Sequence, residues 1–140
     1  MRQLNFMKFI LPVSFFLSAP FIIQAQSIIV NPRSHLIMNG AVYLVVKNAA
    51  LINNGRVSDD LGTVQFNGHK DTSVSYLSGT QATTLYNLTV SKTALGTTLK
   101  SAVAVRNVLS AYGGILYAQG NLTLKSDSSL TADCCTVGTT

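Results

Sequence analysis

The densest group of ionisable residues in the chain is His69-Lys70-Asp71, directly after an Asn67-Gly68 pair. His69 and Asp71 stand at positions i and i+2, so on a strand they would share one face and could contribute to a catalytic triad. A triad also needs a serine brought near by folding, and the chain has no Gly-x-Ser-x-Gly nucleophile elbow. His35 is isolated. We interpret residues 69–71 as a solvated turn and predict that the chain is not an enzyme.

Two residue pairs have metal-ligand chemistry but lack the spacing of a metal site. Asp59-Asp60 supplies carboxylates, but Ca²⁺ takes about six to eight oxygen ligands and no aspartate-rich repeat provides them. Cys134 and Cys135 are adjacent, which disfavours a disulfide between them and gives no metal-ligand pattern. We predict a polar loop at residues 59–60, thiols that are free or paired between molecules, and no metal or cofactor.

Tyrosines are the remaining candidates for ligand contact, because an aromatic ring can stack on a sugar. The chain has five tyrosines and no tryptophan. The strip would consist of Tyr43 together with the candidate contact residues Tyr76, Tyr86, Tyr112 and Tyr117. If the chain winds in coils, these rings could instead stack on one another in register between coils. We favour this structural role.

The composition disfavours exposed helices. Charged residues make up 11% of the chain, against about 25% in an ordinary soluble domain, and glutamate is absent. Thr, Ser, Asn and Gly supply the polarity, as expected where strands and turns face water. The formal net charge is +5, but the basic residues are spread singly along the chain. We interpret them as scattered solvated charge and predict no nucleic-acid partner.

Residues 1–25 have the features of a cleaved secretory signal peptide. Arg2 and Lys8 precede an apolar run over residues 9–23, and Ala25 offers a small residue at the cleavage point. A transmembrane anchor is the alternative, but this run is short and contains two prolines. We therefore predict export, a secreted or cell-surface location, and no membrane contact after cleavage.

From Ser27 onward, short apolar runs alternate with Asn, Gly and Ser turns, a pattern typical of an all-β chain. The apolar entries to successive segments are spaced 22, 21, 18 and 19 residues apart; they are Val42, Val64, Leu85, Val103 and Leu122. The fragments Asn87–Ser91 and Asn121–Lys125 also resemble each other.

This period predicts a single-stranded, right-handed β-helix or β-solenoid with coils of about 20 residues. The domain would span residues 26–132, followed by a disordered or truncated tail over residues 133–140. A β-sandwich is the alternative, because strands every 8–12 residues give a similar pattern.

Several segments together resemble the repeats of large secreted surface proteins of Bacteroidetes-type bacteria. The resemblance covers approximately residues 36–131, and its segments are Phe66-Asn67-Gly68, Ser78-Gly79-Thr80, Thr83–Val90, Thr98–Leu109 and Gly120–Asp127. It implies extended β-solenoid or adhesin-like stalks on substrates of type IX secretion. It carries no catalytic residues. Such proteins usually continue into further modules and a sorting domain, so we expect this chain to be a fragment.

We therefore expect an exported, non-enzymatic structural or adhesive surface segment built of stacked β coils. Its partners would be neighbouring solenoid modules of a longer chain, or other copies bound through the coil ends, together with a surface glycan. The alternatives are a secreted carbohydrate-binding β-sandwich that uses the tyrosines, and a fragment of a β-helix enzyme acting on polysaccharides.

Overall fold

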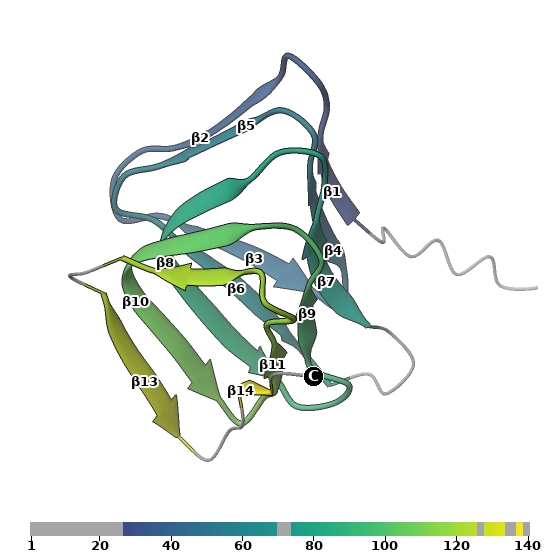
Figure 1. Ribbon diagram of the computed structural model, residues 1–140, viewed down its shortest axis with the longest axis vertical. Coiled ribbons are helices and arrows are strands. Elements are labelled where there is room, and N and C mark those ends of the chain that lie inside the picture. The colour runs from purple at the N-terminus through teal and green to yellow at the C-terminus, as the bar shows by residue number, and fades with distance from the viewer. Residues whose placement is uncertain (1–26, 70–73, 126–127, 134–136, 139–140) are drawn as a thin grey trace, which may run out of the picture.

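The computed structural model describes residues 27–69, 74–125, 128–133 and 137–138, which form fourteen β-strands (Figure 1). The predicted signal peptide, Asp71 and the two cysteines lie outside these described residues. Among the described residues, no helix offers the length and apolarity that crossing a bilayer requires.

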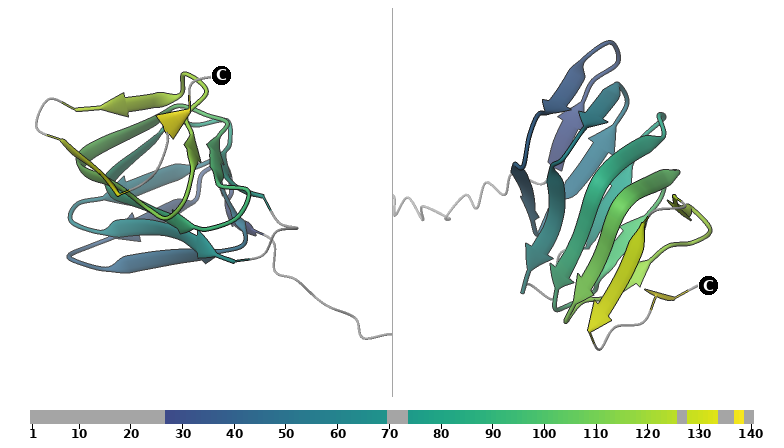
Figure 2. Two further views of the ribbon diagram at one scale, coloured as in Figure 1. Left: turned by 90° about the horizontal axis from the view of Figure 1, so that it is seen from below. Right: turned by 90° about the vertical axis from the view of Figure 1, so that its left-hand side faces the viewer.

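The strands wind into a β-solenoid of about 5 turns with coils of about 21 residues, which confirms the predicted fold class. Every strand pair is parallel, so the β-sandwich alternative is wrong. The coils are layered from the N-terminal end to the C-terminal end (Figure 2, left).

The coils present three sheets. Sheet A contains, in spatial order, β1 (Ser27–Val30), β4 (Ala50–Asn53), β7 (Ser75–Ser78), β9 (Thr97–Leu99), β11 (Leu116–Tyr117) and β14 (Val137–Gly138). Sheet B pairs β2 (His35–Met38) with β5 (Arg56–Asp59). Sheet C contains β3 (Tyr43–Lys47), β6 (Thr63–Gly68), β8 (Thr83–Lys92) and β10 (Val103–Tyr112), and β10 pairs with both β12 (Leu122–Leu124) and β13 (Ser129–Asp133). Strand β14 lies within the predicted tail and pairs with β11.

Strands β8 and β10 are each ten residues long because they continue around a corner of the coil. Only residues 87–92 of β8 pair with β6, whereas the first part of β8 lies against β5. The register between β8 and β10 shifts between Val105 and Val108, at the same corner. Sheet B therefore passes into sheet C without a loop in the later coils.

Stacked aliphatic side chains form the core. Val64, Leu88 and Leu109 are register partners in three successive coils, and all three are buried. Leu51, Leu77 and Leu99 form the same kind of row in sheet A. Because each coil is one chain thick, its inward side chains become buried only when a neighbouring coil covers them.

The five apolar residues whose spacing predicted the coil length are only partly register partners. Val103 pairs with Leu122 as predicted, but Val64 pairs with Leu44 and Leu88 rather than with Val42 and Leu85. The similar fragments at residues 87–91 and 121–125 also lie on different sides of the coil, because Leu122 pairs with Val103 whereas Leu88 pairs with Leu109. The corners differ in length between coils, so the period drifts.

A buried asparagine fixes the corner after β4. Asn53 Nδ2 donates to the Thr83 hydroxyl (3.0 Å) and to the Ala82 carbonyl (3.3 Å), and its Oδ1 accepts from the Gly55 N–H (3.2 Å). Gly79 has a φ of +132°, and a Cβ there would overlap the Asn53 backbone. Glycine is required at this position because the two coils approach too closely for a side chain.

Candidate functional site

The corner between β5 and β6 is built around the carboxylate of Asp59, which is only 4% exposed. Its Oδ1 accepts from the Gly62 N–H (2.7 Å) in its own coil, and its Oδ2 accepts from the Tyr86 N–H (2.8 Å) in the next coil. The predicted polar loop is therefore wrong for Asp59, because its carboxylate links two coils. Asp60 is exposed, as predicted.

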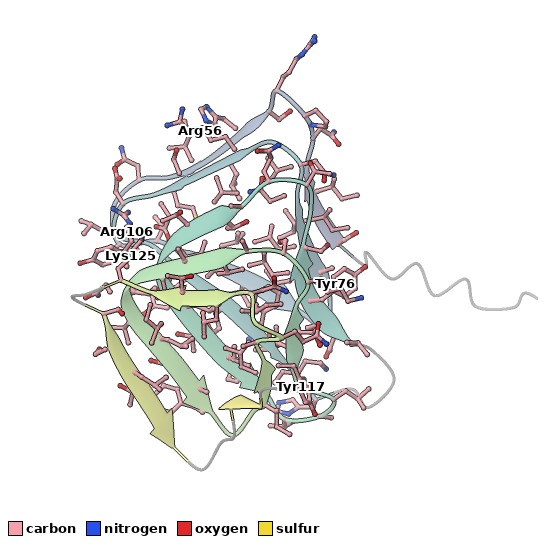
Figure 3. The ribbon with its side chains drawn as sticks, viewed as in Figure 1. Arg56, Tyr76, Arg106, Tyr117 and Lys125 are labelled. Atoms are coloured by element: carbon pink, nitrogen blue, oxygen red, sulfur yellow. The ribbon has the colours of Figure 1, made fainter. Side chains whose placement is uncertain are left out.

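Arg106 extends this corner into a third coil. Its guanidinium donates to the Asp59 carbonyl and lies 5.5 Å from the centre of the Tyr86 ring, within cation–π range. Lys125 follows in the next coil, where its backbone N–H donates to the Val105 carbonyl (3.0 Å) next to Arg106 (Figure 3). The corner thus holds the coils together through polar contacts that run along the solenoid axis.

A second charged residue is buried where sheet C ends. Lys92 is 0% exposed, and its Nζ lies 3.2 Å from Asn48 Oδ1 in an earlier coil. The prediction that all basic residues are scattered solvated charge is therefore wrong for Lys92.

The hydroxyls of Ser75 and Thr97, which are register partners, are buried without a hydrogen-bond partner among the described residues.

The two histidines do not meet. His69 is exposed, and its Nδ1 lies 3.0 Å from the Thr93 hydroxyl of the next coil. His35 pairs in register with Arg56 on sheet B. Within the described ranges, no group of three or more His, Cys, Asp or Glu side chains could hold a metal ion.

The candidate tyrosines are distributed over several sides of the coil rather than along one strip. Tyr76 and Tyr117 belong to sheet A (Figure 3). Lys100 Nζ lies 4.2 Å from the centre of the Tyr76 ring. The Tyr86 ring is in cation–π contact with Arg106. Tyr112 lies on sheet C, and so does Tyr43.

The predicted stacking of tyrosines on one another in register is wrong for Tyr76 and Tyr117. Tyr76 pairs with Ala50 and Thr98, and Tyr117 pairs with Thr98 and Gly138. The rings therefore alternate with small residues along the stack.

The outer face of sheet C carries a shallow groove of about 350 Å³. Its strands lie side by side and run in one direction (Figure 2, right). The lining residues are uncharged; they are Tyr43, Thr63, Asn87, Thr89, Asn107, Val108, Ser110 and Tyr112. Residue type alone identifies Tyr43 and Tyr112 as candidates. It does not identify the Asn, Thr and Ser residues between them, because these residue types are also typical of turns.

A hydrogen-bonded chain of side chains runs across this groove from coil to coil. Asn107 Nδ2 donates to Asn87 Oδ1 (2.9 Å), and Asn87 Nδ2 donates to the Thr63 hydroxyl (3.2 Å) and to the Gly62 carbonyl (3.2 Å). On the same sheet, Gln65 Nε2 donates to the Ser91 hydroxyl (3.2 Å). These hydrogen bonds orient the side-chain amides of Asn87, Asn107 and Gln65.

A second hollow, of about 430 Å³, lies at the corner between sheets A and B in the first coils. It has a basic lining that includes Arg33, His35 and Arg56, and no carboxylate contributes to it. Its chemistry suits an anion, in contrast to the uncharged groove on sheet C.

Comparison of the chain with protein families, with curated proteins and with solved structures found no match.

The two neighbouring aspartates provide a matched test of the corner. We expect Asp59→Ala to lower the free energy of unfolding by about 2–3 kcal/mol, because two backbone N–H groups lose their acceptor. We expect Asp60→Ala to change it by less than about 0.5 kcal/mol, because its side chain is exposed. Urea unfolding followed by circular dichroism measures both values, and equal effects of the two substitutions would contradict this role for Asp59.

Proposed function

We propose that the chain is an exported, non-enzymatic structural and adhesive segment that extends or presents a bacterial cell surface. Neighbouring modules of a longer chain, or other copies of this chain, would continue its stack of coils. The observation that carries this proposal is the parallel register of sheets A and C, which the chain repeats from coil to coil. The resemblance to adhesin-like surface repeats supports the location and the role.

The side chains that could act in catalysis already have structural roles, which supports a non-enzymatic function. The Asp59 carboxylate is occupied by two backbone N–H groups, and His69 contacts Thr93 of the next coil. The arrangement joins coils rather than assembling an acid, a base and a nucleophile around one position.

The edge of β3 is suited to pairing with another strand. The Thr63 N–H donates to the Val42 carbonyl (2.8 Å), and the Asn48 N–H donates to the Asn67 carbonyl (2.9 Å). In a parallel ladder, alternate residues bond to opposite neighbours, so the even-numbered residues of this segment bond to β6. The N–H groups of Tyr43, Val45 and Lys47 therefore point to the side where the described residues place no strand.

Apolar side chains accompany both ends of the described stack. In the first coil, Ile29, Ile37 and Val45 are exposed, and near the C-terminal end Leu124 and Leu130 are exposed. Unpaired strand edges next to exposed apolar side chains favour pairing with another chain. Association through coil ends is thus the contact that this surface supports best.

Substitution of Val45 tests association through the N-terminal edge. Val45→Pro removes one outward N–H while the bonds from β3 to β6 remain, whereas Val45→Thr keeps that N–H and serves as the matched control. We expect the chain and Val45→Thr to associate with rising concentration, and Val45→Pro to shift the equilibrium at least about tenfold towards the monomer. Sedimentation equilibrium measures this shift. A chain that stays monomeric, or equal association of the two variants, would contradict the role of this edge.

Export is tested separately with the full chain in a bacterial host. We expect a released product whose mass corresponds to a start at Gln26, and retention of the Phe16→Arg variant, because a charge interrupts the apolar run of the signal. Asp60→Ala is the control and should be released normally. An intact chain beginning at Met1 inside the cell would contradict export.

A further inference from the structure

We propose that the groove on the outer face of sheet C binds a neutral oligosaccharide, with Tyr43 and Tyr112 as stacking platforms and Asn107 and Thr89 as hydrogen-bonding groups. This inference rests on the adhesive function proposed above, because it assigns the ligand class of the adhesive contact.

Two exposed rings border the groove. Tyr43 on β3 is 71% exposed and Tyr112 on β10 is 48% exposed, so both present ring surface to solvent. Tyrosine suits an interface that is partly apolar and partly wet, because its ring is apolar and its hydroxyl is polar. The C–H faces of a pyranose ring and its equatorial hydroxyls match this combination.

The floor between the rings offers hydrogen bonds without charge. Register connects Tyr43, Thr63, Asn87 and Val108 in one row, and Thr89 and Ser110 in the next row. No Asp, Glu, Lys, Arg or His side chain lines the groove. A neutral, polyhydroxylated ligand can bind here without leaving an unpaired charge, whereas an anionic ligand would find no cation.

The asparagine chain holds the floor rigid before a ligand arrives. Asn87 uses its amide in three hydrogen bonds, with Asn107, Thr63 and the Gly62 carbonyl. Among the described residues, no hydrogen bond uses Asn107 Oδ1 or the Thr89 hydroxyl, so no described residue occupies either group. Groups that are already fixed lose little conformational entropy on binding, which favours affinity.

The length of the groove fits a short oligosaccharide better than a single sugar. The row from Tyr43 to Val108 crosses three strand-to-strand steps, and each step is about 4.8 Å, which gives about 14 Å along the solenoid axis. An extended chain of about three sugar units would therefore run across the strands and contact successive coils.

The inference is tested with the full chain on an immobilised array of neutral cello-, manno-, xylo- and N-acetylchito-oligosaccharides of three to six units, with oligogalacturonate as an acidic probe. We expect binding to at least one neutral series, and at least tenfold weaker binding for Tyr43→Ala, Tyr112→Ala and Asn107→Leu. Tyr112→Phe keeps the ring and should retain most of the affinity. Tyr76→Ala is the matched control, because it removes a tyrosine from sheet A rather than from the groove.

Salt dependence separates this site from the basic hollow near Arg56. Affinity for the neutral probe should change less than about twofold between 0.1 and 1 M NaCl, because no ion pair forms. Binding to no neutral series, equal loss with Tyr76→Ala, or binding of oligogalacturonate alone that Arg56→Ala abolishes would overturn the inference. A chain that is exported and associates normally but binds no neutral series would overturn this inference alone and leave the structural function standing.

Discussion

The contact on which the rest of the structure depends is the stacking of inward aliphatic side chains between successive coils. A single coil has no interior, because its chain passes only once around the core. Leu51, Leu77 and Leu99 on sheet A, with the Val64, Leu88 and Leu109 row on sheet C, become buried only through the coils above and below. Backbone pairing fixes the spacing of these rows at about 4.8 Å, so each side chain contacts its partner at van der Waals distance. The stability of every coil is therefore tied to its neighbours.

The polar interior groups follow from the same constraint, since corners bring backbone groups of different coils together. Asn53 joins its own corner to Thr83 of the next coil, and Asp59 does the same with Tyr86. Such groups stabilise the corners because buried donors and acceptors need partners. Asn87 pairs in register with Val108, and Asn107, at the neighbouring register shift, reaches Asn87 on the outer face of sheet C. The candidate groove is thus a product of the stacking and not a separate addition to it.

The all-β class and the coil length could be predicted because the apolar runs recur with nearly the length of one coil. The register could not, since segments of sheets B and C look alike in sequence. Leu85 and Leu88 both stand in an apolar–x–x–apolar pattern, yet only Leu88 pairs with Val64, while Leu85 pairs with Val105. The different corner lengths that decide this are set by contacts between coils, which a linear period does not contain.

The candidate site, too, could be predicted from the sequence only in part. Tyr43 and Tyr112 could be named from residue type alone, but their place on one sheet depends on the register. No sequence signal separates Asp59 from Asp60. Asp59 is the last residue of β5 and is buried, whereas Asp60 follows the strand and is exposed. Spacing of polar residues by one coil length, as between Asn87 and Asn107, is the signal that could have indicated the groove.

Cross-linking of register partners tests the parallel stacking most directly. Gln65 and Thr89 are partners on neighbouring coils, so the Gln65→Cys/Thr89→Cys variant, with Cys134 and Cys135 changed to Ser, should form a disulfide on mild oxidation. Val45 and Thr89 are two strands apart, at about 9.6 Å, so the Val45→Cys/Thr89→Cys variant should not cross-link within one molecule. Peptide mass mapping of the monomer reads out both variants. Cross-linking of the second pair, or of neither pair, would contradict the stacked-coil account.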